Sequence, residues 1–82
     1  MVTVEVIVPA FNQSYDFQLD ESTKLSLVLE EIIEMLCRKE KRNMPASFDA
    51  FCLAAVEQGI FLHMDATLQD YHIRNGARLI LT

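Results

Sequence analysis

Apolar and polar side chains alternate over the first eight positions of the chain. Thr3, Glu5 and Ile7 separate four valines, which are Val2, Val4, Val6 and Val8. A period of two that is rich in β-branched residues is typical of a β-strand. Ile7 makes the second face of this strand partly apolar, so we expect the strand to lie centrally in a sheet. Pro9 is expected to close it.

A second alternating segment follows a short turn. Asn12-Gln13-Ser14 has the chemistry of a turn. Tyr15, Phe17 and Leu19 then alternate with polar residues. The two alternating segments together predict a β-hairpin.

The spacing of apolar residues then changes to three and four, which is the period of a helix. The apolar stripe consists of Leu25, Val28, Leu29, Ile32, Ile33 and Leu36. Its width is typical of a helix that packs on a sheet. Residues 20–23 combine two candidate N-cap side chains, Ser22 and Thr23, with acidic residues at the positive end of the helix dipole. Asn43 and Pro45 are expected to end the helix.

Three further strands are expected, over residues 48–56, 60–62 and 77–82. Together these patterns predict an α+β domain in which one helix packs on a sheet. The helix stripe should meet a single core, and the expected sheet-side partners are Val4, Val6, Phe17, Leu68, and Leu79 or Leu81.

The C-terminal third carries a more specific pattern. Thr67-Leu68-Gln69-Asp70-Tyr71-His72-Ile73 is followed by Asn75-Gly76 and a short apolar run. From Ala54 to Thr82 the sequence resembles the end of ubiquitin without a gap. The resemblance implies a ubiquitin-like β-grasp fold of order β-β-α-β-β-β, with a mixed sheet of four to five strands and the last strand beside the first.

The whole chain also resembles a narrower family, the small YukD and EsaB ubiquitin-like proteins of bacterial type VII secretion loci. Met44-Pro45 follows the helix, as in that family. The closing pattern of the family is matched by Leu68, Asp70, Ile73, Asn75, Gly76 and Leu79. The sequence departs from the family at Ala77, where an aspartate is usual.

Length and charge restrict the possible functions. Eighty-two residues are expected to form a single domain, residues 1–82. The net charge of -5 argues against a nucleic-acid binder, which needs an excess of Lys and Arg. The longest unbroken apolar run has six residues, whereas a membrane-spanning helix needs about 20, so we expect no stable membrane insertion. The two cysteines do not form a disulfide pattern, which favours a reduced, cytoplasmic protein.

No group of residues predicts catalysis, a cofactor or a metal site. Cys37 and Cys52 lack a Cys-x-x-Cys spacing, and we expect them to be ordinary apolar-face cysteines. His63 and His72 are expected on the surface, with a pH-sensitive contact as the alternative. The glutamates of residues 30–34 should form a solvated helix face. The basic residues at 38–42 already have a role as cations at the negative end of the helix, although contact with anionic lipid or nucleic acid is the alternative.

The candidate binding surface is a face of the sheet. In ubiquitin-like proteins the sheet surface opposite the helix commonly docks partners, and the resemblance places Ala54, Val56, Ile80 and Thr82 on it. A solvated face should carry polar residues, yet three of these four positions are apolar. Two interpretations remain open: a protein-docking patch, or scattered apolar surface of the ordinary kind.

We therefore expect a protein-interaction module that is not an enzyme. The resemblance implies a cytosolic accessory or regulatory component of a Gram-positive type VII secretion system, with a protein partner such as a membrane component of that system. The alternatives are a ubiquitin-like domain of a larger transporter subunit and a sulfur-carrier protein. The sulfur carrier and conjugation both need a C-terminal Gly-Gly, whereas this sequence ends in Leu81-Thr82. The sequence does not predict an oligomeric state.

Overall fold

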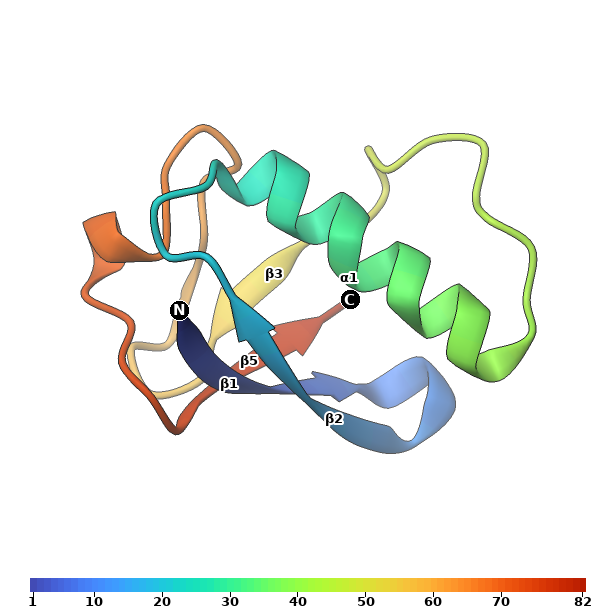
Figure 1. Ribbon diagram of the computed structural model, residues 1–82, viewed down its shortest axis with the longest axis horizontal. Helices are drawn as coiled ribbons and strands as arrows, with labels where there is room; N and C mark the ends of the chain where they lie inside the picture. Colours follow the sequence, from blue (N-terminus) through green and yellow to red (C-terminus); the bar gives the residue numbers. More distant parts are fainter.

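The structure is a computed structural model that describes residues 1–82. One α-helix lies across one side of a five-stranded mixed sheet (Figure 1). The elements in chain order are β1 (Val2–Val8), η1 (Pro9–Phe11), β2 (Gln13–Leu19), α1 (Leu25–Glu40), β3 (Leu53–Ala55), β4 (Ile60–Phe61), η2 (Gln69–Tyr71) and β5 (Ala77–Leu81).

The order of strands in the sheet is β2-β1-β5-β3-β4. β1 and β2 form the predicted antiparallel hairpin, with Val2 opposite Leu19 and Val8 opposite Gln13. β5 returns to the centre of the sheet and runs parallel to β1, with Val6 opposite Leu79. This arrangement confirms the expected β-grasp topology, in which the last strand pairs beside the first.

The core lies between α1 and the sheet, as the alternating patterns predicted. It is a single cluster of 18 buried hydrophobic residues. All six residues of the predicted helix stripe belong to it, and so do the predicted sheet-side partners, including both Leu79 and Leu81. A chain of this size has little apolar area to bury, so each of these side chains carries a large share of its stability.

The prediction for the start of the helix is wrong. Neither Ser22 nor Thr23 caps α1, because the N-cap residue is Lys24 and it makes no side-chain capping bond. Ser22 donates instead to Asp20 Oδ1, through its backbone N–H at 2.9 Å and its hydroxyl at 2.7 Å. The first turn of α1 also contains no acidic residue. The polar segment before the helix is therefore a local Asx-type turn rather than a cap.

The first helical N–H groups are satisfied by a distant part of the chain. Leu25 N–H donates to the carbonyl of Ala66 at 2.8 Å, and Ser26 N–H donates to the carbonyl of Met64 at 2.9 Å. Helix starts need such partners because their first N–H groups have none within the helix. Backbone carbonyls of the 64–66 loop thus replace the side-chain cap that the local sequence suggested.

The helix ends slightly earlier than predicted. Its last residue is Glu40, and Lys41 takes a left-handed conformation with φ of 55° and donates its N–H to the Cys37 carbonyl. An ion pair joins Glu34 to Arg38, four residues later on α1. The basic residues of the last turn lie at the negative end of the helix, as expected.

The third strand is much shorter than predicted. Residues 48–52 and Val56 lie outside the strand, and only Leu53–Ala55 form β3. Phe51 N–H donates to the Phe48 carbonyl at 3.1 Å, which closes a turn, and both aromatic side chains pack partly buried against the core. The apolar pattern predicts a strand here because a turn anchored by aromatic side chains has the same local composition.

Candidate functional site

A row of apolar side chains crosses the sheet on the face opposite α1. Ile7 of β1 lies opposite Ile80 of β5. Ile80 also lies opposite Ala54 of β3, and Ala54 lies opposite Phe61 of β4. Directly paired residues in neighbouring strands point to the same face. These four side chains, Ile7, Ile80, Ala54 and Phe61, are called the open-face row below.

The four side chains of the open-face row differ in their exposure to solvent. Phe61 is 68% exposed, whereas Ile7, Ala54 and Ile80 are half-buried by their neighbours in the sheet. β4 has only two residues and forms one edge of the sheet, so few groups cover the Phe61 ring. The row therefore presents one prominent aromatic side chain next to a shallow aliphatic strip.

A polar row borders the open-face row on one side. Glu5 lies opposite Arg78, and Val56 donates its N–H to the Arg78 carbonyl at 3.0 Å. The Glu57 carboxylate accepts two hydrogen bonds from Arg78, from the backbone N–H at 2.9 Å and from Nε at 2.7 Å. Both hydrogen bonds lower the pKa of Glu57, and the bond from the backbone N–H has the larger effect. The Glu57 carboxylate in turn raises the pKa of Arg78.

Cys52 and Thr82 extend the sheet on the other side of the open-face row. Cys52 N–H donates to the Thr82 carbonyl at 2.8 Å, and Thr82 N–H donates to the Cys52 carbonyl at 3.0 Å. The Cys52 side chain is exposed. Cys37 is half-buried near the end of α1, and its thiol donates to the Asn43 carbonyl at 3.6 Å.

The structure places the four predicted surface residues on this one face. Ala54 and Ile80 are direct partners, Val56 lies one row away, and Thr82 lies beside Cys52. Two apolar members of the face were not among the predicted site residues, namely Ile7 and Phe61. The apolar character of Ile7 is visible in the sequence, but there it indicates only a central strand.

The histidines and the helix glutamates singled out from the sequence lie on the surface. His63 and His72 are both exposed, as are Glu30, Glu31 and Glu34 of α1. No group of three or more His, Cys, Asp or Glu side chains is arranged to hold a metal ion. No helix is both long enough and apolar enough to cross a membrane.

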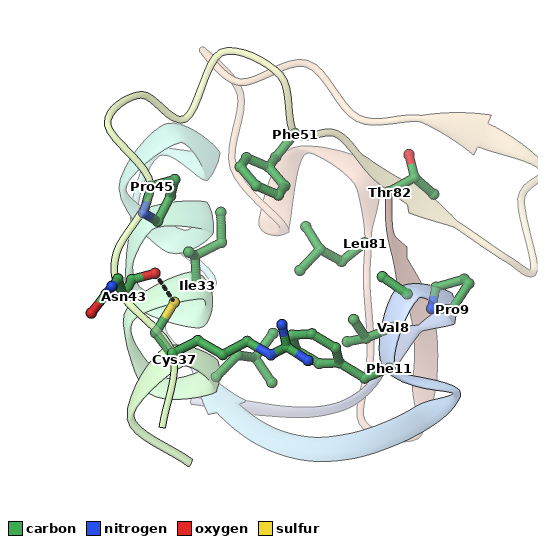
Figure 2. A pocket seen from close by; sticks show the side chains of 13 residues that line it. Val8, Pro9, Phe11, Ile33, Cys37, Asn43, Pro45, Phe51, Leu81 and Thr82 are labelled. Atoms are coloured by element: carbon green, nitrogen blue, oxygen red, sulfur yellow. Dashed lines mark hydrogen bonds between the residues drawn. The ribbon is translucent and has the colours of Figure 1, made fainter. Parts of the chain in front are cut away.

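A second surface feature lies on the helix side of the sheet. It is an apolar groove of about 500 Å³ between the C-terminal half of α1, the β1–β2 turn and the end of β5. Figure 2 shows labelled side chains from these elements, among them Val8, Ile33 and Leu81, gathered around it, with Phe51 and Pro45 contributed by the 43–51 segment. The groove and the open-face row lie on opposite sides of the sheet, since the inward-facing Val8 and Leu81 alternate with the outward-facing Ile7 and Ile80.

Comparison with known proteins supports the fold. No protein-family model and no curated protein sequence matches the chain. Among solved structures, it is similar to the ubiquitin-like domain of EccD5 from Mycobacterium xenopi, with a TM-score of 0.75 and 16% identity over 99% of this chain and 91% of that chain. It is also similar to a chain of the MycP5-free ESX-5 inner membrane complex in state II, with a TM-score of 0.75 and 17% identity over 99% of this chain and 20% of that chain. A designed protein based on ubiquitin gives a TM-score of 0.68 and 16% identity over 99% of this chain and 85% of that chain. The chain therefore has a ubiquitin-like β-grasp fold.

Proposed function

We propose that this domain is a protein-interaction module of the YukD and EsaB type, which serves as a cytoplasmic accessory component of a type VII secretion system. Its action is recognition of a protein partner rather than catalysis. The observation that carries the proposal is the open-face row, in which four apolar side chains from four strands form one surface. Two unpaired cysteines, one of them exposed, suit a reducing compartment.

The structural comparisons support a secretion role. One similar structure is a domain of EccD5, and another is a chain of an ESX-5 inner membrane complex. The similarity spans 20% of the latter chain, so the same fold also occurs there as one part of a longer polypeptide. This observation favours one alternative function, a ubiquitin-like domain that belongs to a larger subunit of a membrane transporter.

The open-face row suits a protein interface for physical reasons. Interface centres are enriched in aromatic side chains and depleted of charge, while their rims are polar. Phe61 provides the aromatic group, and Glu5 and Arg78 lie along one side of the row. A fully desolvated anchor of this kind commonly contributes about 2 kcal/mol or more to binding. We therefore assign Phe61 as the anchor and Ile7, Ile80 and Ala54 as the surface that surrounds it.

The test combines a folding measurement with a secretion measurement. Phe61→Glu should leave the melting transition in circular dichroism nearly unchanged, yet it should reduce secretion of a type VII substrate by the organism that encodes the chain. Gln18→Glu is the matched control, because Gln18 is exposed on the same face but lies opposite Thr3 and away from the row. Normal secretion by a folded Phe61→Glu variant would remove the row from consideration.

A separate observation distinguishes the main proposal from its alternative. An accessory protein should be encoded next to the genes of a type VII system and recovered as a short polypeptide from cells. A domain of a larger subunit should instead be recovered, with an antibody against this domain, as part of a much longer chain in the membrane fraction. Mass measurement of the recovered protein separates the two without reference to the surface residues.

A further inference from the structure

The apolar groove beside the end of α1 has the features of a ligand site. Its volume of about 500 Å³ falls within the range of roughly 300–1,000 Å³ that is common for small-molecule sites. Its floor consists of core residues with little remaining exposure, namely Val8, Ile33, Leu36 and Leu81. Phe11 and Phe51 form part of its walls. The groove can therefore remove a large apolar group from water.

The only charged side chain that lines the groove is Arg42. Its guanidinium carbon lies 4.7 Å from the centre of the Phe11 ring, a cation–π contact that holds the charge beside the apolar surface. The ion pairs of the structure involve the N-terminus with Glu21, Arg38 with Glu34, and Arg78 with Glu57, so Arg42 has no carboxylate partner. A ligand with a carboxylate would supply one.

The main-chain groups around the groove are poorly suited to a peptide. Pro9 and Pro45 have no N–H, and the Pro9 carbonyl already accepts from Asn12. Arg42 N–H donates to the Cys37 carbonyl, and both main-chain groups of Thr82 bond to Cys52. A peptide bound here would leave many of its own amide groups unpaired, which is costly. An occupant with a hydrocarbon body and no amide groups fits the lining better.

We propose that this groove binds an aliphatic carboxylate, with the hydrocarbon chain against Val8, Ile33 and Leu81 and the carboxylate against the Arg42 guanidinium. The site is distinct from the open-face row, because none of the four row side chains lines the groove, which meets the open face of the sheet only at Thr82. The domain can thus hold such a ligand and a protein partner at the same time.

The test uses straight-chain carboxylates of increasing length as probes of the intact chain. Hexanoate, octanoate and decanoate are titrated below their micelle-forming concentrations, and amide chemical shifts are followed by NMR. The largest shifts should occur at Ile33, Cys37 and Leu81. The affinity should rise about fourfold for each added methylene group, which is the gain expected when a methylene leaves water.

Charge reversal at the rim tests the role of Arg42. Arg42→Glu should weaken decanoate binding by about tenfold and strengthen binding of decyltrimethylammonium, because the sign of the rim charge is inverted. Arg42 is exposed, so the change should leave the fold intact. Arg74→Glu is the matched control, since Arg74 is exposed, lies outside the groove and makes no ion pair, and it should leave decanoate affinity nearly unchanged.

Three results would overturn the proposal. The first is the absence of saturable decanoate binding to the wild-type chain. The second is a set of shifts centred on Phe61 and Ile80, which would place the carboxylate on the open-face row. The third is equal decanoate affinity in wild type and Arg42→Glu, which would show that the charge at the rim has no part in binding.

Discussion

The side-chain oxygen of Asn75 accepts a hydrogen bond from the backbone N–H of Thr3 at 2.8 Å. The next residue, Gly76, donates its N–H to the Thr3 carbonyl at 2.9 Å and has a positive φ of 87°. These two bonds join the start of β1 to the start of β5, although the residues are separated by more than 70 positions. They set the register of the parallel pair that closes the fold.

Asn75 therefore should contribute measurably to stability. Asn75→Ala removes the acceptor for the Thr3 N–H, and the free energy of unfolding should fall by about 0.5–1.5 kcal/mol, the usual net value of such a bond. Asn75→Asp keeps an oxygen at the same place and should recover most of the loss. Urea denaturation of both variants measures the difference, and equal stability of Asn75→Ala and wild type would show that the bond does not stabilise the fold.

The Glu57–Arg78 pair should make the stability of the fold depend on pH. The pKa of Glu57 is lowered in the folded protein, first by the Arg78 backbone N–H and then by its guanidinium. The unfolded chain therefore binds a proton more readily than the folded chain, so this contribution is fully present above the ordinary glutamate pKa of 4.5 and is lost as the pH falls through the lowered folded value.

Glu57→Gln should make the stability of the fold less dependent on pH. The difference in melting temperature between wild type and Glu57→Gln should be largest near neutral pH and should shrink as the pH falls below about 4.5. Other carboxylates, such as Asp20, also lose favourable bonds in acid, so the difference between the two proteins is the relevant quantity. Glu31→Gln, on the exposed face of α1, is the control, and a difference that stays constant with pH would contradict the assignment.

The core prediction concerns the centre of the helix stripe. Ile32 is fully buried between α1 and the sheet, whereas Glu30 is exposed on the other side of α1. Ile32→Ala removes buried methyl groups and leaves a cavity, so it should cost about 2–5 kcal/mol. Glu30→Ala should change stability by less than about 0.5 kcal/mol. Thermal melts that show the same loss for both variants would mean that the helix packs by another face.

Periodicity was sufficient to predict the core, because burial follows directly from which side chains share a face. The strand valines and the helix stripe needed no knowledge of distant residues. The helix start was different, since the Leu25 N–H donates to the carbonyl of Ala66, 41 residues away. Local sequence suggested Ser22 or Thr23 instead. Long-range backbone partners of this kind leave no trace in the local pattern.

The candidate surface was predicted only in part for a similar reason. Ala54 and Ile80 were assigned to one face, and they are direct partners across β3 and β5. Phe61 was missed because β4 has two residues, too few to show any alternation. The face of the sheet on which the Phe61 side chain lies is known only once the pairing of Phe61 with Ala54 is known. The composition of the face thus depends on register, which the sequence alone does not reveal for a strand of this length.

Glycine substitutions at two lysines near the end of α1 should change the free energy of unfolding in opposite directions. Lys41 has φ of 55°, a conformation that costs an L-residue roughly 1 kcal/mol but is free for glycine. Lys41→Gly should therefore raise the free energy of unfolding by about 0.5–1 kcal/mol. Lys39→Gly, two residues earlier within the helix, should lower it by about 1 kcal/mol, because glycine has poor helix propensity. Losses of stability in both variants would show that the helix continues past Glu40.

The last prediction separates two members of the open-face row, Ile80 and Phe61, by their burial. Ile80 and its neighbour on the same face, Val56, are both half-buried. Ile80 also lies in the central strand β5, between Ile7 and Ala54. A carboxylate at this position would be partly removed from water without a partner, and such burial costs stability.

Ile80→Glu should accordingly destabilise the fold by about 1–3 kcal/mol, whereas Phe61→Glu should cost less than about 1 kcal/mol because the Phe61 side chain is 68% exposed on an edge strand. Urea denaturation measured at pH 7 compares the two variants directly, and Ile80→Val is the control for a change of shape without charge. If Phe61→Glu proves the more damaging substitution, the ring is packed in the isolated domain and cannot serve as a free anchor for a partner. Only the predicted order, with Ile80 structural and Phe61 dispensable for folding, leaves Phe61 available for binding.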